Sequence, residues 1–300
     1  MFYFLKISDM ENALNFFGWF LSITAVIGNS SVIVLIALNR RLHSTANWFV
    51  LSLAVADAML GFTVFPPAYF CTAEKCNLKM VSAFFWFSLH SSVSNLCNLT
   101  WDRYIAIVHP LKYNTSFTKR HPGLVIVIAW LLAFTISSST LVTQYVTKSD
   151  TALNILFFIT VSGFLLLSCA LLFYAAIRII MVAHKQKQQE VIIQLQLRCN
   201  QLFTDGEDNA LCLRRNKKNS APFIVAVVFF FLGCYLAVNG LVLCITFSCN
   251  VSERAGQVIT ILLILNSVVN PFVYACLKKD IKRELAILVR KWKIKLNTST

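Results

Sequence analysis

Seven long apolar segments, each near the length that a helix needs to cross a bilayer, constrain the fold of this 300-residue chain. A helix rises about 1.5 Å per residue, so roughly 20 residues span a hydrocarbon core about 30 Å thick. The chain is also 57% hydrophobic and only 13% charged, which excludes an ordinary soluble domain. We therefore predict an all-α membrane protein, a seven-transmembrane helix bundle, with spans at 16–38, 48–70, 80–104, 123–146, 152–180, 221–247 and 256–277.

Polar segments flank the spans and divide the chain into three parts. Residues 1–15 are a predicted extracellular tail, residues 16–277 the seven-helix domain, and residues 278–300 an amphipathic helix with a cytoplasmic tail. The polar insert 184–219 is predicted to prolong the fifth helix inward and then to return as a cytoplasmic loop. The amphipathic helix carries Lys and Arg around an apolar face, as helices on the inner leaflet do. That face consists of Ile281, Leu285 and Leu288.

The basic residues indicate how the chain is oriented in the bilayer. All but five of the 27 Lys and Arg residues fall on one side, which the positive-inside rule makes cytoplasmic. The five on the outer side are Lys6, Lys75, Lys79, Lys148 and Arg254. Anionic lipid of the inner leaflet accounts for the net charge of +14, so no nucleic-acid partner is expected. We expect a multi-pass plasma-membrane protein with its N-terminus outside.

Two acidic residues, Asp57 and Asp102, lie within the spans, where charged groups are costly and usually functional. They belong to motifs that occur in six different spans and, in this order, resemble those of a rhodopsin-like (class A) G-protein-coupled receptor. The resemblance covers essentially the whole chain, and a looser one links it to the melanocortin, cannabinoid and lysophospholipid branch. The motifs are Gly28-Asn29, LAVAD ending at Asp57, Asp102-Arg103-Tyr104, Trp130, Tyr174 and NPFVY from Asn270 to Tyr274.

The resemblance implies a two-state switch at the cytoplasmic ends of the helices. Asp102 pairs with Arg103 at rest, and Arg103 leaves this pair when the sixth helix swings out to admit a heterotrimeric G protein. The alternative is that Arg103 only binds lipid phosphates. Basic residues replace the acid that also holds this arginine in many relatives, so we predict ligand-independent activity. The switch residues are Asp102, Arg103, Tyr104, Tyr174, Asn270, Pro271 and Tyr274.

A second set of polar residues matches the family positions that coordinate a sodium ion. These residues are Asp57, Ser92, Asn266, Ser267 and Asn270. A hard cation prefers oxygen ligands, and a buried carboxylate needs a counter-ion. The alternative is a protonated Asp57 that is hydrogen-bonded to Asn29 and Asn270. No other cofactor is expected.

The predicted ligand is a small extracellular molecule that is neutral or lipid-like. The outer half of the third span has no acid for an amine, and the seventh span has no lysine for retinal. The remaining pocket is apolar and aromatic with few polar groups, which suits a small molecule. Its residues are Phe85, Ser88, Leu89, Phe164, Tyr235, Val238, Asn239 and Leu263. The alternative is that these side chains fill the core of a constitutively active receptor that has no ligand.

The outer loops carry candidate modification sites. Cys71 with Cys76 and Cys244 with Cys249 are close enough in sequence to form local disulfides, although spacing alone does not establish geometry. The Asn-Val-Ser sequon makes Asn250 the candidate for glycosylation.

We thus predict a receptor that passes an extracellular signal to heterotrimeric G proteins and catalyses no reaction of its own. The alternative is a non-signalling seven-helix partner or trafficking protein. The sixth span favours this alternative, because Ala237 stands where the family has a proline.

Overall fold

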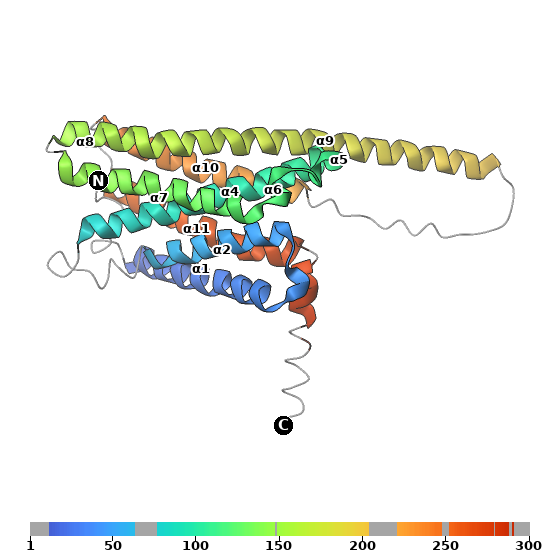
Figure 1. Cartoon of the computed structure of the whole chain (residues 1–300), viewed down its shortest axis with the longest axis horizontal. Helices are drawn as coiled ribbons and strands as arrows, with labels where there is room; N and C mark the ends of the chain where they lie inside the picture. The colour runs from blue at the N-terminus through green and yellow to red at the C-terminus, as the bar shows by residue number, and fades with distance from the viewer. Residues whose placement is uncertain are drawn as a thin grey trace, which may run out of the picture.

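The computed structural model describes residues 12–63, 77–147, 149–203, 221–247, 252–278, 280–287 and 290. Within these ranges the long helices lie side by side in a bundle, and α9 projects well beyond one end (Figure 1). This arrangement confirms the predicted all-α bundle. Its long helices are α1 (Asn12–Leu38), α2 (Thr45–Thr63), α4 (Leu78–Val108), α7 (Pro122–Val146), α9 (Gly163–Phe203), α10 (Ala221–Thr246) and α11 (Glu253–Leu277).

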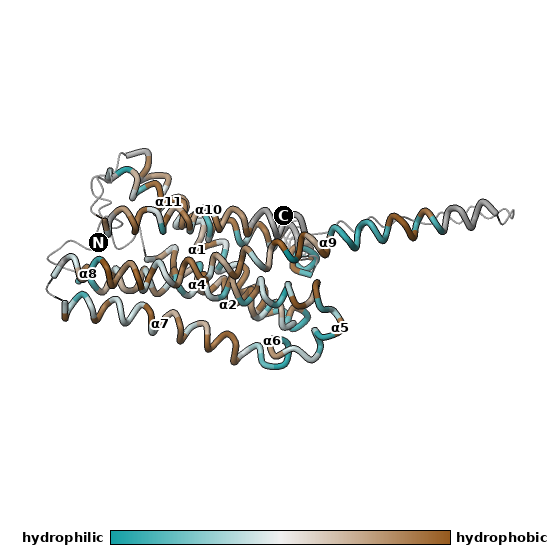
Figure 2. Tube along the Cα trace, turned by 90° about the horizontal axis from the view of Figure 1, so that it is seen from above, coloured by the Kyte–Doolittle hydropathy of each residue, from teal (hydrophilic) through white to brown (hydrophobic). Residues whose placement is uncertain are grey.

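Several helices continue past the predicted spans. The helix α1 begins at Asn12, inside the predicted tail, and α9 runs on to Phe203, as predicted for the start of the polar insert. Figure 2 shows the change along α9, which is mainly hydrophobic in the bundle and mixed in character where it projects. A helix can extend beyond the bilayer in this way because its backbone hydrogen bonds are internal at any depth.

The helix α4 occupies the centre of the bundle, where it packs against α2, α7 and α9. Five segments of the described chain are long and apolar enough to span a membrane by length and composition, and α4 is not among them. The reason is its content of buried polar residues, among them Ser88, His90, Ser92 and Asn95. Because α4 faces other helices more than lipid, such side chains find hydrogen-bond partners inside the protein.

One hydrogen-bonded chain joins three helices through α4. Trp130 Nε1 on α7 donates to Ser52 Oγ on α2 at 2.9 Å, and Ser52 Oγ donates to Asn95 Oδ1 on α4 at 2.8 Å. Hydrogen bonds between membrane helices contribute about 0.6–2 kcal/mol each. This chain therefore fixes the rotation of α2 relative to both neighbours.

The fifth span is interrupted by a feature that the sequence analysis did not predict. The helix α8 (Asp150–Phe157) connects to α9 through a π-helical turn, η4 (Phe158–Ser162). A π-helical turn holds an extra residue and rotates the side chains that follow it. Val161 and Ser162 of this turn are fully buried.

Short helices connect the ends of the long ones, and a further helix follows α11. The connecting helices are η3 (Arg40–Leu42), α5 (Pro110–Tyr113) and α6 (Phe117–Arg120). Residues 280–287 are helical, as predicted. Ile281 is buried and Leu285 packs against the bundle core, so these two residues of the apolar face contact protein. Leu288 lies outside the described residues.

Most residues of the predicted disulfides and the sequon fall outside the described ranges. These are Cys71, Cys76, Cys249 and Asn250. Cys244 lies on α10, near its end at Thr246.

The contact between α1 and α2 depends on the missing side chain of Gly61. A Cβ atom there would lie 3.0 Å from Val26 Cγ2 and 3.2 Å from the Ser22 carbonyl oxygen. We expect Gly61→Ala to lower the free energy of unfolding by about 1–3 kcal/mol, because the two helices must separate. Thermal unfolding of the detergent-solubilised protein measures the effect.

Gly240 on α10 provides the matched control, since nothing lies within 4 Å of a Cβ atom at that position. Gly240→Ala should leave stability unchanged or raise it by up to about 1 kcal/mol through helix propensity. Equal destabilisation by both substitutions would contradict the packing argument.

Candidate functional site

The fully buried carboxylate of Asp57 is the centre of a polar cluster that joins α2, α4 and α11. Its Oδ1 accepts hydrogen bonds from Ser92 Oγ at 2.7 Å and Ser267 Oγ at 2.9 Å. Its Oδ2 accepts one from Asn270 Nδ2 at 2.6 Å. Four of the five residues assigned to a sodium site thus meet directly. The fifth, Asn266, is buried but makes no hydrogen bond to Asp57.

Asn29 lies next to this cluster without reaching the carboxylate. Its Nδ2 donates to the Ala25 carbonyl oxygen at 2.9 Å and to the Ser267 carbonyl oxygen at 3.0 Å. Of the two predicted hydrogen bonds to Asp57, the one from Asn270 is therefore present and the one from Asn29 is not. Asn29 instead connects α1 to α11.

Asp102 and Arg103 form an ion pair at the end of α4. Arg103 Nη2 lies 3.0 Å from Asp102 Oδ2, and the Arg103 side chain is 31% exposed while that of Asp102 is fully buried. The other carboxylate oxygen, Oδ1, accepts a hydrogen bond from the Tyr113 hydroxyl at 3.1 Å. Asp102 is thus held by two donors, one of which the sequence analysis did not include.

The three tyrosines assigned to the switch differ in their surroundings. Tyr104 is buried, with its ring centroid 5.9 Å from that of Tyr174 on α9, which is half-exposed. Tyr274 is buried, and its hydroxyl has no hydrogen-bond partner among the described residues. Pro271 lies inside α11 and packs close to Gly28 on α1. A Cβ atom added to Gly28 would lie 3.1 Å from Pro271 Cγ.

The residues assigned to the ligand pocket lie in the interior of the bundle. All are buried except Phe164, which is partly exposed and packs against the core. Ser88 Oγ donates to the Phe84 carbonyl oxygen and Asn239 Nδ2 to the Tyr235 carbonyl oxygen, so each satisfies a carbonyl of its own helix. The apolar and aromatic residues of this set belong to the main hydrophobic core of the bundle or pack against it.

Comparison with known protein families agrees with this geometry. Residues 28–274 match the model of the 7 transmembrane receptor (rhodopsin family). The chain belongs to this family. The matched range contains both polar clusters, since it begins at Gly28 and ends at Tyr274.

Individual relatives of this rhodopsin-family receptor match it over different lengths. The trace amine-associated receptor 7c of Rattus norvegicus is 40% identical over 128 residues, which cover 41% of this chain and 36% of that protein. The match thus spans about a third of the relative's length. The adenosine receptor A2a of Canis lupus familiaris is 26% identical over 300 residues, covering 90% of this chain and 70% of that protein.

His90 is a buried polar residue of the receptor that the sequence analysis overlooked. Its Nδ1 lies 3.0 Å from Ser137 Oγ on α7, and its ring lies 5.0 Å from that of Phe164. Nε2 is buried without a hydrogen-bond partner among the described residues. The sequence feature that could have indicated His90 is a titratable residue close to Ser88 and Ser91 in the middle of an apolar span.

A second overlooked cluster joins the start of α2 to the helix at 280–287. Asn47 Nδ2 donates to Asp280 Oδ2 at 2.8 Å and to the Leu42 carbonyl oxygen at 2.9 Å. Asn47 Oδ1 accepts a hydrogen bond from Lys278 Nζ. Burial, together with the positive charge of Arg103, lowers the pKa of Lys278 to about 8. The hydrogen bonds from Asn47 to Asp280 and from Lys278 to Asn47 join segments that are more than 230 residues apart in the sequence.

The bond from Tyr113 to Asp102 leads to a prediction about pH. Burial and the neighbouring Asp102 carboxylate raise the pKa of Tyr113 from 10.0 to about 12. The folded receptor therefore binds this proton more tightly than the unfolded chain does. The resulting contribution to stability is complete below pH 10 and is lost as the pH rises towards 12.

Absorbance at the tyrosinate band, titrated for the receptor and for Tyr113→Phe, tests this prediction. The difference between the two curves should show little ionisation of Tyr113 at pH 11, a unit below its pKa of about 12. Circular dichroism at each pH checks that the helices remain folded. A difference curve with its midpoint at pH 10 in the folded protein would contradict the prediction.

Proposed function

We propose that this receptor passes an extracellular signal to a heterotrimeric G protein. The observation that carries the proposal is the ion pair at the end of α4, in which a fully buried Asp102 holds a partly exposed Arg103. An ion pair of this kind can be exchanged for other partners when the helices move, whereas a fully enclosed pair would cost far more to break. Family membership supports the same role.

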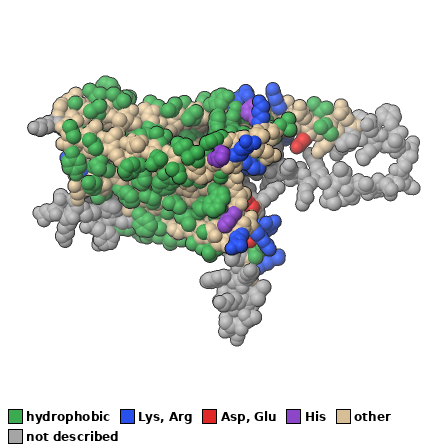
Figure 3. All heavy atoms as spheres, viewed as in Figure 1, with side chains coloured by type: hydrophobic (Ala, Val, Ile, Leu, Met, Phe, Trp, Pro, Cys, Tyr) green, Lys and Arg blue, Asp and Glu red, His purple; other side chains and the backbone are tan. Residues whose placement is uncertain are grey.

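The charge distribution supports a cytoplasmic position for this end of the bundle. Figure 3 shows Lys and Arg side chains gathered at the end from which α9 projects, while hydrophobic side chains cover the length of the bundle. Arg40, Arg41, Lys119 and Arg120 belong to the connecting helices η3 and α6 there. We place this end in the cytoplasm of a cell with the receptor in its plasma membrane, and the N-terminus outside.

The ligand is proposed to be a small neutral or lipid-like molecule. The names of the relatives refer to trace amines and adenosine, which are small molecules. The first turns of α4 carry Lys79 and aromatic residues but no acid that could pair with an amine. The buried residues Phe85, Leu89 and Tyr235 provide apolar and aromatic surface for a neutral ligand.

Exchange of a GTP analogue on purified G proteins tests the proposed function. We expect membranes that carry the receptor to stimulate exchange above empty membranes, without added ligand, on at least one class of G protein. The class that responds then provides the readout for a ligand screen. If surface expression is confirmed and no class responds, the predicted ligand-independent activity is wrong.

We infer further that the Asp57 cluster binds a sodium ion. The carboxylate and the hydroxyls of Ser92 and Ser267 supply oxygen ligands from three helices. Among the described residues no Lys or Arg pairs with Asp57. A buried carboxylate without such a partner must take up either a proton or a cation. The oxygen ligands fit a hard cation once the two hydroxyls turn their lone pairs towards it.

Replacing choline chloride with sodium chloride at constant ionic strength should therefore raise the melting temperature of the receptor by about 3–5 °C. Asp57→Asn should remove this response, because the amide lacks the negative charge that balances the cation. Potassium chloride provides the control for ion size. A sodium response that persists in Asp57→Asn would contradict binding at this cluster.

A further inference from the structure

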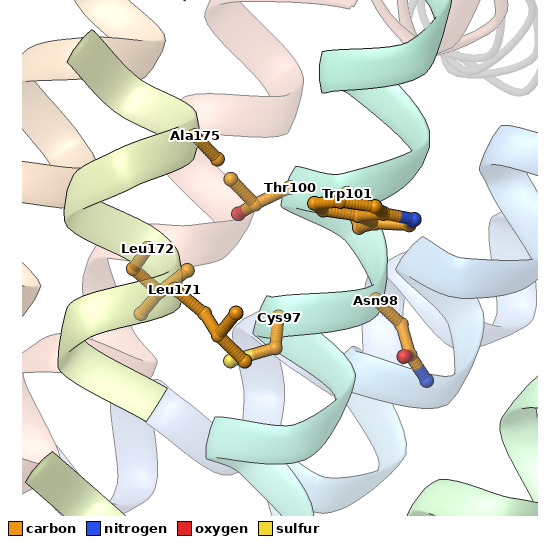
Figure 4. A pocket seen from close by; sticks show the side chains of 7 residues that line it. All are labelled: Cys97, Asn98, Thr100, Trp101, Leu171, Leu172 and Ala175. Atoms are coloured by element: carbon orange, nitrogen blue, oxygen red, sulfur yellow. The ribbon is translucent and has the colours of Figure 1, made fainter. Parts of the chain in front are cut away.

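A cavity of about 230 Å³ lies between α4 and α9, outside the predicted ligand pocket and the Asp57 cluster. Figure 4 shows Cys97 and Thr100 of α4 pointing towards α9, with Ala175 of α9 pointing back towards α4. The cavity lies within two helical turns of Asp102, on the half of the bundle that carries the ion pair. Its lining residues are Cys97, Asn98, Thr100, Trp101, Leu171, Leu172 and Ala175.

The rim of this cavity faces the lipid, whereas its floor is inside the protein. The rim residues Trp101 and Leu171 are 40% and 47% exposed on the outside of the bundle. The floor residues Thr100, Leu172 and Ala175 are buried. A molecule dissolved in the hydrocarbon can therefore reach the cavity sideways from the bilayer, without passing through water.

The floor contains one polar group that lacks a partner. Among the described residues, no hydrogen bond is made by the Thr100 hydroxyl. By contrast, the buried residues Thr140 and Thr260 donate to carbonyl oxygens of their own helices at 2.7 and 2.9 Å. An unpaired hydroxyl next to hydrocarbon is costly, because lipid tails offer no hydrogen bond in its place. An occupant with a hydrogen-bonding group would relieve this cost.

Two residues of the cavity, Trp101 of the rim and Ala175 of the floor, contact Tyr104 of the proposed switch. The Trp101 ring stacks on that of Tyr104, with centroids 4.9 Å apart and an angle of 24°. Ala175 packs with Tyr104 and Ile179 in one apolar cluster. Because the cavity lies between α4 and α9, an occupant would favour the spacing of these helices that fits it best.

We propose that the cavity between α4 and α9 binds a small apolar molecule that carries a single hydroxyl or carbonyl group and enters from the bilayer. Its apolar body fills the space between Cys97, Leu171 and Leu172, and its polar group bonds the Thr100 hydroxyl. Binding does not depend on the proposed function. The further effect, a shift of the Arg103 switch, rests on that function.

Photolabelling with a diazirine-bearing alkylphenol, on the full chain in lipid nanodiscs, tests the binding. We expect saturable labelling of peptides from 97–101 and 171–175, and competition by the unlabelled alkylphenol. Leu171→Trp should block the rim and reduce this labelling at least about fivefold. Leu131→Trp on α7 is the matched control, because Leu131 is 57% exposed and lies outside the cavity. Unsaturable labelling, or equal labelling of the two variants, would overturn the site.

Thr100→Val tests the hydrogen bond while it keeps the shape of the side chain. We expect the alkylphenol to compete about tenfold more weakly in this variant. The matched alkylbenzene, which lacks the hydroxyl, should change by less than about twofold. Equal weakening of both compounds would overturn the role of Thr100. Site-specific labelling with no change in nucleotide exchange by an active receptor would overturn the effect on the switch and leave binding established.

Discussion

The Arg103→Ala receptor is expected to lose nucleotide exchange on G protein, falling at least tenfold to the level of empty membranes. The guanidinium of Arg103 is the partly exposed member of its ion pair, near the end of α4 at Val108. In the proposed switch it is the member that leaves Asp102 and contacts a G protein when the helices move. Binding of a GTP analogue, corrected for surface expression, measures the loss.

Two further substitutions separate this role from a general effect of charge. Asp102→Asn weakens the pairing with Arg103 and should raise ligand-independent exchange, since about 1–2 kcal/mol shifts a two-state equilibrium five- to thirtyfold. Arg120→Ala removes an exposed guanidinium from α6 and should leave exchange within about twofold of wild type. Full activity in Arg103→Ala would contradict the proposed switch and favour an arginine that only binds lipid phosphates.

Asp57→Ala is expected to destabilise the receptor by about 2–5 kcal/mol. The substitution leaves three buried donors without their acceptor, namely Ser92 Oγ, Ser267 Oγ and Asn270 Nδ2. It also disconnects α2 from α4 and α11 at one point. The melting temperature of the solubilised receptor, measured by fluorescence-detected size exclusion after heating, reports the change.

The next serine along α4 supplies a matched control. Ser91 is fully buried like Ser92, but its hydroxyl has no hydrogen-bond partner among the described residues. Ser91→Ala should therefore leave stability within about 0.5 kcal/mol of wild type, while Ser92→Ala should cost about 1 kcal/mol or more. Similar melting temperatures for Asp57→Ala and Ser91→Ala would show that the cluster does not hold the helices together.

The sequence predicted the helices well because their hydrogen bonds are local. A long apolar run satisfies its own backbone in lipid only as a helix, whatever its neighbours are. The resemblance to the family predicted that Asp57, Ser92, Asn266, Ser267 and Asn270 would meet. In the structure Ser92, Ser267 and Asn270 hydrogen-bond Asp57, whereas Asn266 does not.

Contacts between remote segments could not be predicted in the same way. Tyr113 reaches Asp102 only because α4 ends at Val108 and the chain turns back through α5, starting at Pro110. The partner of His90 is Ser137, on another helix. A pattern within one span shows that such residues are polar, but it does not show which helix faces them.

The sequence by itself therefore determined that seven helices cross a membrane, which end carries the positive charge, and where the motifs of the rhodopsin family lie. Only the tertiary structure decided how each helix is rotated about its axis. It also revealed the π-helical turn at Phe158–Ser162, the hydrogen bond from Tyr113 to Asp102 and the cavity beside Thr100. The physical reason is that the bilayer selects a helix through its length and apolarity, which are properties of one segment. Rotation is set by packing and hydrogen bonding between segments, which a single run of residues does not contain.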